Sequence, residues 1–355
     1  MERILIKNGR VFENNRFVCK DLFTTNGVIS KIEPSINDPA DFVFDAKGMI
    51  VSSGLVDTHV HIKGLSSNDF GISGEMSCLP FGVTAAADAG SSQGDGQLLK
   101  SIALKSVLFV EQGIRGDTLD FEQCERLLEK FVDKAIGLKV YFDTANPAVR
   151  DIKQLEQACR YAKSKGVKVM VHCSNSPTPM ADIVNTLSHG DILTHIYHGG
   201  QNNCTENDFE AFRVAKARGV VMDTGFAGHI HTDFAVLRQA IGEGFFPDTI
   251  STDITKLSAY KRGGRYGMTT CMSMLKALGM SEEDIFKRVT RAPAEALGMS
   301  EKWGCLSVGK AADIAVFDYT DESFDFTDKA GNNFKSEYGY RCALTVLDGQ
   351  LVYKD

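Results

Sequence analysis

The chain has 355 residues, of which 43% are hydrophobic and 24% charged, a composition typical of a folded globular protein and not of a disordered one. Its formal net charge is −7 and its basic residues form no concentrated run, which argues against a nucleic-acid partner. The nine cysteines form no C-x-x-C pair, so we expect reduced thiols and neither a disulfide framework nor a zinc ribbon. The first residues lack the apolar core of a signal peptide, and no stretch approaches the ~20 apolar residues of a membrane span.

Both ends of the chain carry the signals of short strands. Near the N-terminus the strand-like runs are Ile4–Ile6, Arg10–Phe12, Val28–Ile32 and Phe42–Phe44, separated by the turn sequences Asn8-Gly9, Asn14-Asn15, Asn26-Gly27 and Asn37-Asp38-Pro39. Near the C-terminus, Asp348-Gly349 joins two apolar runs and predicts a hairpin. We therefore expect a small β-sandwich accessory domain built from both termini, residues 1–52 and 302–355.

Residues 53–301 alternate apolar runs with amphipathic stretches such as Asp151–Lys165 and Asn207–Arg218. The candidate strands are Gly54–His61, Gly82–Asp88, Val107–Gln112, Ala135–Phe142, Val167–His172, Asp191–His195, Gly219–Asp223 and Thr249–Asp253. Eight strand–helix units in this length match an α/β fold, the (β/α)8 TIM barrel. An open doubly wound sheet is the alternative. That fold typically carries a G-x-G-x-x-G turn after an early strand, and this sequence has no such motif there.

The first candidate strand of the barrel ends in a His-x-His pair, His59 and His61. Residues i and i+2 of a strand project to the same face, so the two imidazoles can share one metal ion. Taken alone, the pair could equally be two polar residues at a strand end. Three further strands end in His172, His195 and Asp253, and the carboxyl ends of barrel strands are where chemistry is built. Four such ends in register favour a metal site.

Lys139 stands inside the apolar strand Ile136–Phe142. Either it occupies an edge position from which the amine reaches solvent, or it is buried. Burial would lower the pKa of the amine, and the neutral amine can react with carbon dioxide to form a carbamate. Such a carbamate has two oxygens and can bridge two cations.

Together these residues resemble the amidohydrolase superfamily, in its binuclear subtype with a carboxylated lysine. The resemblance covers nearly the whole chain and is carried by Gly48–His61, Gly82–Ser91 and Leu306–Val316, which are similar to the first-strand signature, the second-strand motif and the return into the β-sandwich. It implies a metal-dependent hydrolase acting on carbon–nitrogen bonds other than peptide bonds. The details in Ala87–Ser91 and Asp191–His195 are most similar to the deacetylase-like branch.

The resemblance also implies six ligands for two divalent metal ions: His59, His61 and Asp253 on the more buried metal, His172 and His195 on the more exposed one, and carboxylated Lys139 bridging both. Zinc is expected from the ligand types, although manganese, iron or cobalt would fit the same set. A bridging hydroxide attacks the substrate carbonyl, and Asp253 carries its proton to the leaving group. Asp57 either orients a ligand imidazole or caps the strand.

The deacetylase-like branch implies a small-molecule substrate, an N-acyl or O-acyl compound. Two positions depart from that branch, because Phe226 and Thr255 stand where its members carry histidines. A cyclic amide hydrolase of the dihydroorotase or hydantoinase type is the alternative. Dihydroorotases usually carry an arginine two residues after the His-x-His pair, and Lys63 lacks the bidentate fork of arginine, which weighs against this alternative.

Candidate substrate contacts lie in loops at the expected barrel mouth: His198, His229, His231, Tyr260, Arg262 and Arg265. The basic loop after Asp253 either receives an anionic group of the substrate or is a solvated surface loop. The second His-x-His pair begins six residues past the end of the seventh strand, so we expect its histidines to contact substrate and not metal.

Two other classes of protein are compatible with the barrel. A non-catalytic relative would have lost several ligands, whereas this chain keeps all six. A mononuclear deaminase would lack the bridging lysine, so Lys139 discriminates between the two kinds of enzyme. We expect a cytoplasmic homo-oligomer without a nucleic-acid or membrane partner.

Overall fold

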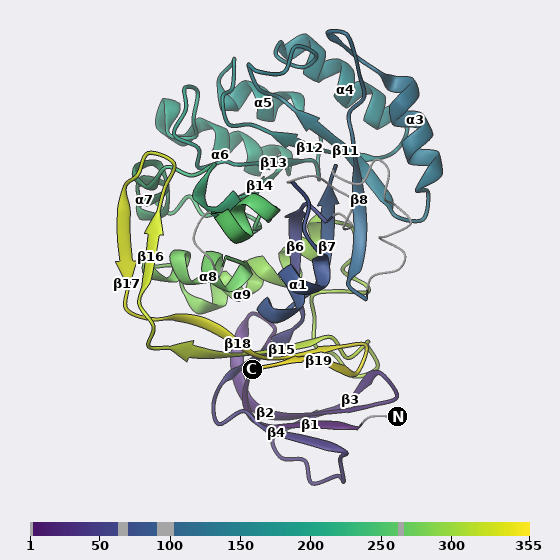
Figure 1. Ribbon diagram of the computed structural model, residues 1–355, viewed down its shortest axis with the longest axis vertical. Helices are drawn as coiled ribbons and strands as arrows, with labels where there is room; N and C mark the ends of the chain where they lie inside the picture. Colours follow the sequence, from purple (N-terminus) through teal and green to yellow (C-terminus); the bar gives the residue numbers. More distant parts are fainter. Residues whose placement is uncertain (1–2, 63–69, 91–102, 262–265) are drawn as a thin grey trace.

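The computed structural model describes residues 3–62, 70–90, 103–261 and 266–355. It shows a barrel of strands surrounded by helices, with a mostly-sheet domain below it (Figure 1). This architecture confirms the predicted fold class. No helix among these residues is both long and apolar enough to cross a bilayer.

The barrel strands form one parallel sheet, as expected for alternating strands and helices. In the described part of the chain, its members in spatial order are β6 (Leu55–Val60), β7 (Val83–Ala89), β8 (Lys105–Glu111), β11 (Ala135–Tyr141), β12 (Lys168–His172), β13 (Ile192–Thr194) and β14 (Val221–Asp223). Their side chains are nearly all buried, since helices cover one face and the barrel interior fills the other. All seven coincide with predicted strands to within about two residues at each end.

The eighth predicted strand, Thr249–Asp253, closes the barrel without forming a regular strand. It makes isolated parallel bridges on both sides, from Thr249 to Asp223 and from Ile254 to Val60. Asp253 has a φ of 46°, which interrupts the extended backbone. The segment therefore joins the last strand to the first while turning one carboxylate out of the strand direction.

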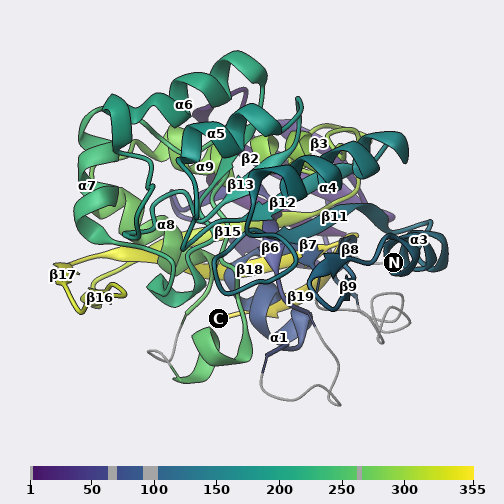
Figure 2. The same cartoon turned by 90° about the horizontal axis from the view of Figure 1, so that it is seen from above.

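Helices surround the strands, as the view from above shows (Figure 2). They are α1 (Gly74–Cys78), α3 (Phe121–Lys130), α4 (Ile152–Ser164), α5 (Met180–Thr186), α6 (Glu206–Arg218), α7 (Phe234–Gly242), α8 (Met268–Ala277), α9 (Glu282–Val289) and α10 (Arg291–Ala296), with the short 3₁₀ helices η1 (Leu79–Phe81) and η2 (Ala227–His229) and the short π-helix η3 (Leu257–Lys261). The predicted helix around Asp151–Lys165 is confirmed and starts with a capping box between Asp151 and Gln154. In α6, Asn207 to Phe209 have left-handed φ values, so regular helix begins only after them.

The two termini meet in one hydrogen-bonded sheet below the barrel (Figure 1). Its strands are β1 (Ile4–Glu13), β2 (Arg16–Thr25), β3 (Val28–Glu33), β4 (Phe42–Asp45), β5 (Ile50–Ser53), β15 (Ile314–Thr320), β18 (Gly339–Leu347) and β19 (Gln350–Lys354). Ile4, Val11 and Leu22 share a buried core with Ile314 and Leu344 from the other end of the chain. The predicted turn at Asp348-Gly349 joins β18 to β19, and both of its residues have positive φ.

The prediction of a turn at Asn8-Gly9 is wrong, because β1 runs through it. Asn8 has a φ of 56°, and the pairing of β1 with β2 shifts register between Ile6 and Gly9. The two residues therefore form a bulge inside one strand, which left-handed conformations also allow.

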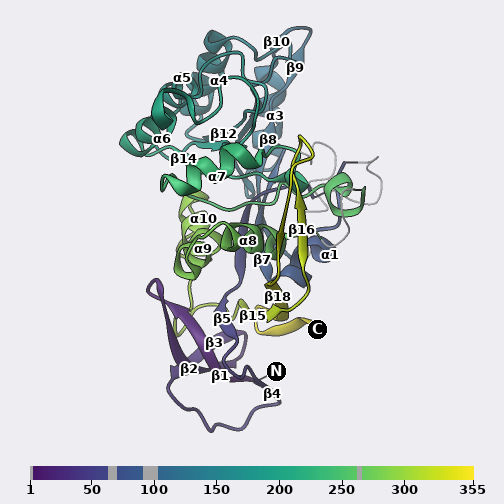
Figure 3. The same ribbon diagram turned by 90° about the vertical axis from the view of Figure 1, so that its left-hand side faces the viewer.

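A hairpin from the C-terminal segment extends from this sheet along the side of the barrel. Its strands, β16 (Phe324–Thr327) and β17 (Asn333–Ser336), stand beside α7 in two perpendicular views (Figures 1 and 3). The Phe334 ring lies 4.8 Å from that of Phe234, the first residue of α7. The smaller pair β9 (Ile114–Arg115) and β10 (Thr118–Leu119) lies near α3. The β16–β17 hairpin therefore braces the loop that precedes α7.

Candidate metal centre

The predicted ligands converge at the carboxyl ends of the barrel strands. They line one cavity of about 400 Å³ and are all at least nine-tenths buried: His59, His61, Lys139, His172, His195 and Asp253. They come from β6 and the residue after it, from β11 and β12, from the residue after β13, and from the segment that closes the barrel. The cavity also contains His231, which the sequence placed among substrate contacts.

One group of ligand atoms consists of His59, His61 and Asp253. Asp253 Oδ1 lies 3.2 Å from His59 Nε2 and 2.9 Å from His61 Nε2. Donors held roughly 2.0–2.2 Å from one cation are separated by about 3 Å, so these spacings fit a shared metal ion. Asp253 reaches this place because its backbone N–H donates to His59 O at 2.7 Å and its left-handed φ turns the chain there.

Buried polar contacts hold His59 in this orientation. Its Nδ1 lies 3.0 Å from Thr194 Oγ1, and that hydroxyl donates to Asp223 at 2.7 Å. Asp57 accepts the His59 backbone N–H and the Thr252 hydroxyl, at 3.1 Å and 2.6 Å. Asp57 therefore joins the first strand to the segment that contains Asp253. Its contact to His59 is made through the backbone N–H, which fits the strand cap among the two roles considered for Asp57.

A second group consists of His172, His195 and His231. The ring centroids of His172 and His195 are 4.4 Å apart, and that of His231 lies 4.1 Å from His195 and 5.0 Å from His172. His195 Nδ1 is 2.7 Å from Gly225 O, a contact that leaves Nε2 for another partner. His172 Nε2 is 2.7 Å from Ser174 Oγ. The three imidazoles therefore lie close together, and those of His195 and His172 are held in place by Gly225 O and Ser174 Oγ.

Lys139 lies buried at the same end of the barrel, with Nζ 2.9 Å from His59 Nε2. Burial lowers the pKa of its amine to about 8, despite the raising effect of Asp253 and other carboxylates. Gly90 makes room beside it, because a Cβ there would lie 3.2 Å from Lys139 Cβ. The buried placement contradicts the alternative of an edge amine in solvent. It fits a lysine poised for carboxylation.

Two properties of these residues suit the binding of metal ions: the protonation state of their side chains and the absence of hydrogen-bond partners for some of their buried atoms. Burial lowers the pKa values of His59 and His195 well below the usual range, and that of His172 to about 3, so these three imidazoles are neutral at pH 7 and able to accept a cation. Burial alone would raise the pKa of Asp253, but His59 and His61 outweigh it and keep the pKa below its ordinary value. Within the described chain, His61 Nδ1 and His195 Nε2 are buried without a hydrogen-bond partner. A bound cation would supply the missing partner of such a nitrogen atom.

Comparison with known proteins identifies the family. The model of the Amidohydrolase family matches residues 50–352. The chain belongs to this family. The amidohydrolase is therefore a hydrolase that acts on carbon–nitrogen bonds other than peptide bonds.

Individual relatives resemble the amidohydrolase along most of its length. A protein of Enterococcus faecalis named deacetylase is 26% identical over 369 residues, covering 98% of each chain. A deacetylase of Brucella anthropi is 29% identical over 332 residues, covering 86% of this chain and 81% of its own. A crystal structure described as a dihydroorotase superposes with a TM-score of 0.87 at 23% identity, covering 100% of this chain and 98% of its own. The structural match supports the fold.

The cavity of the amidohydrolase has wall residues that the sequence interpretation did not single out. Tyr141 stacks on His172 with ring centroids 3.9 Å apart, and Phe70 lies 4.6 Å from the His61 ring. Glu111, Ile230 and Leu257 complete the wall, together with smaller residues. Tyr141 lies two residues after Lys139 on β11, so alternation along the strand is a signal by which it could have been found.

The predicted substrate contacts are scattered in the structure. His198 is buried, with Nε2 3.8 Å from Cys173 Sγ, and Tyr260 is 59% exposed. His229 packs among aromatic rings, including Phe326 at 5.9 Å. None of these three residues lines the cavity in the described part of the chain, whereas His231 does. Arg262 and Arg265 lie outside the described residues.

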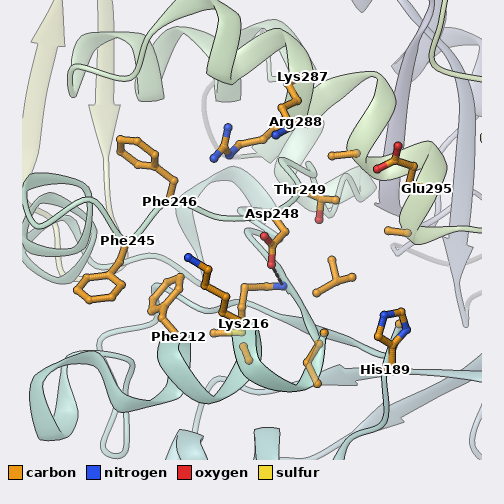
Figure 4. A pocket seen from close by; sticks show the side chains of 18 of the residues that line it. His189, Phe212, Lys216, Phe245, Phe246, Asp248, Thr249, Lys287, Arg288 and Glu295 are labelled. Atoms are coloured by element: carbon orange, nitrogen blue, oxygen red, sulfur yellow. Dashed lines mark hydrogen bonds between the residues drawn. The ribbon is translucent and has the colours of Figure 1, made fainter. Parts of the chain in front are cut away.

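A larger hollow of about 890 Å³ lies at the other end of the barrel. Figure 4 shows side chains that line it, among them His189, Asp248 and Arg288. It is lined by Lys168 and Val221, the first residues of β12 and β14, whereas the histidines stand at the opposite ends of the strands. Asp248 in its wall accepts a hydrogen bond from Met222 N at 2.9 Å and so serves the backbone. Because barrel chemistry is built at the carboxyl face, we place the active site in the smaller cavity.

Proposed function

We propose that the amidohydrolase hydrolyses the amide or ester bond of a small N-acyl or O-acyl compound and uses two divalent cations to do so. The observation that carries the proposal is the pair of ligand groups, His59–His61–Asp253 and the histidines around His195, which share one cavity with buried Lys139. The two relatives named deacetylase support the acyl substrate class.

Each cation has a defined place in this proposal. His59, His61 and Asp253 would hold the first, and His172 and His195 would hold the second. Lys139 would bridge them as a carbamate, which would form when its neutral amine attacks carbon dioxide, makes a nitrogen–carbon bond and releases a proton to solvent. Zinc is the metal we propose, because neutral imidazoles and carboxylate oxygens suit it.

The bound cations supply a water molecule of lowered pKa and polarise the scissile carbonyl. Asp253 is the catalytic residue of the chain itself. Its carboxylate is ionised, since its pKa is held below the ordinary range, so it accepts the proton of the attacking water. It then delivers that proton to the leaving nitrogen or oxygen.

The cavity limits the size and character of the substrate. A volume of about 400 Å³ suits a small molecule, and Phe70, Tyr141 and Ile230 offer apolar surface to an acyl group. An anionic group on the substrate stays a prediction, because the arginines invoked for it lie outside the described residues.

The test is a substrate panel assayed with zinc-loaded protein. It contains N-acyl amino acids, acylated hydroxy acids and cyclic ureides, with and without a chelator. We expect turnover of acyl compounds that the chelator abolishes and zinc restores. Turnover of cyclic ureides alone would instead support the cyclic amide hydrolase. His189→Ala, in the hollow at the far end of the barrel, is the control and should keep full activity.

A further inference from the structure

His231 occupies a position that its place in the chain does not suggest. It lies in the loop between β14 and α7, yet its imidazole packs against those of both His172 and His195. One nitrogen from each ring falls within 4.8 Å of the other two, and His231 Nε2 is 3.8 Å from Asp253 Oδ2. His231 Nδ1 is buried and has no hydrogen-bond partner among the described residues.

The backbone of this loop is bent so that His231 returns over the barrel mouth. Ala227, Gly228 and His229 have φ values of 48°, 62° and 70°, a left-handed run that includes two residues other than glycine. Ala227 N donates to Thr252 O at 2.8 Å, which fixes the bend beside Asp253. Non-glycine residues adopt such angles where the surrounding structure imposes them, often at functional sites.

The hairpin β16–β17 holds the other side of the loop. Asp328 Oδ2 accepts a hydrogen bond from Phe234 N at 2.9 Å, and Lys329 N donates to Thr232 O at 3.3 Å. Asp233 N also donates to Tyr197 O at 2.9 Å. The loop is therefore pinned to the barrel and to the terminal domain on either side of His231, so its imidazole is positioned in advance of any ligand.

We propose that His231 is a third imidazole ligand of the cation held by His172 and His195, and not a contact to the substrate. This inference rests on the proposed binuclear function and extends it to a residue beyond the six expected ligands. His195 Nε2 and His231 Nδ1 are both buried without a hydrogen-bond partner in the described structure. A cation placed among the three rings would give a partner to His195 and to His231 at once.

His229 provides a matched control within the same loop. It precedes His231 by two residues, but its ring packs against Phe234, Tyr266 and Phe326 and stays out of the cavity. A variant such as His229→Gln disturbs the loop while leaving the three-imidazole group complete. It separates the loss of a ligand from a general disturbance of the loop.

The first experiment is a titration of chelator-treated protein with zinc, followed by calorimetry and elemental analysis. The wild type and His229→Gln should bind two cations per chain. His231→Ala should bind the second at least ~10–100-fold more weakly, the range seen even for loss of groups that only support a ligand. Two cations bound by His231→Ala with wild-type affinity would overturn the inference and leave the proposed function intact. Fewer than two bound by the wild type would overturn both.

A second variant gives a signal that a structural role cannot produce. In His231→Cys loaded with cobalt(II), a thiolate in place of the imidazole should add a sulfur-to-cobalt charge-transfer band that is missing from the wild type and from His229→Cys. The wild type, with its own nine cysteines, is the blank. A folded His231→Cys protein without the additional band would contradict coordination by this position.

Discussion

Lys139 Nζ lies 2.9 Å from His59 Nε2, with both side chains at least nine-tenths buried. An ammonium at this place would face several neighbouring imidazoles, and burial already lowers the pKa of the amine to about 8. A neutral amine beside two groups of metal ligands is the state that reacts with carbon dioxide. The burial of Lys139 therefore bears on how many cations the site can hold, because only the carboxylated lysine could bridge two of them.

Replacing Lys139 should remove one of the two cations. We expect Lys139→Ala to lose about one metal equivalent per chain and most activity, because no other side chain would bridge the two groups. Elemental analysis of the purified protein checks this. Lys168→Ala, which changes a half-buried lysine at the other end of the barrel, is the control and should keep both ions. Unchanged metal content in Lys139→Ala would favour a mononuclear site.

Asp253 should matter more for turnover than for substrate binding. Asp253→Asn keeps one oxygen for a cation but removes the carboxylate that we propose as the proton acceptor, so we expect kcat to fall by ~10²–10⁴-fold with a smaller change in KM. Steady-state kinetics at saturating zinc, with metal content measured in parallel, separates the two roles. A variant with full metal content and wild-type kcat would show that another group carries the proton.

The sequence predicted much of this site because each expected ligand stands in or directly after an apolar strand. Parallel strands bring their carboxyl ends to one rim, so His59, His172 and His195 could be placed together without knowing any loop. His231 could not, since its position depends on three left-handed residues and on a hairpin from the far end of the chain.

Backbone details were likewise beyond the sequence. Asn8-Gly9 carries the signal of a turn, but long pairing with β2 keeps β1 extended and converts the signal into a bulge. Asp253 was expected at the end of a regular strand, whereas the segment makes only single bridges to its neighbours. In both cases tertiary hydrogen bonds override the local preference of the chain.

Glu282 should stabilise the contact between the barrel and the terminal domain. At the start of α9 it accepts hydrogen bonds from Arg10 at 3.0 Å, Tyr340 at 3.2 Å and Tyr319. We expect Glu282→Gln to lower the free energy of unfolding by about 1–2 kcal/mol at pH 7, a value reduced for the partial exposure of Arg10. Chemical denaturation of the two proteins measures the difference.

The effect of this substitution should depend on pH. Burial alone would raise the pKa of Glu282, but the hydrogen bonds from Tyr319 and Arg10 outweigh it and hold the pKa below the ordinary value. A carboxyl with a lowered pKa contributes stability above its unfolded pKa and loses that contribution as the pH falls through its folded pKa. The gap between wild type and Glu282→Gln should therefore shrink in acid, and a gap that is constant from pH 7 to below the ordinary glutamate pKa would argue against this account.

Position 90 should require glycine for two reasons: its left-handed backbone angle, and the space that the Lys139 side chain needs beside it. Gly90 has a φ of 91°, and a Cβ there would lie 3.2 Å from Lys139 Cβ and from Glu111 Cβ. Gly279 has a φ of 96° with nothing within 4 Å of an added Cβ, which makes it a matched control. Both Gly90→Ala and Gly279→Ala should lose roughly 1–2 kcal/mol of stability from the left-handed angle. Only Gly90→Ala should also displace Lys139 and lower the content of the second metal, and equal metal contents in the two variants would show that the lysine site tolerates the added methyl group.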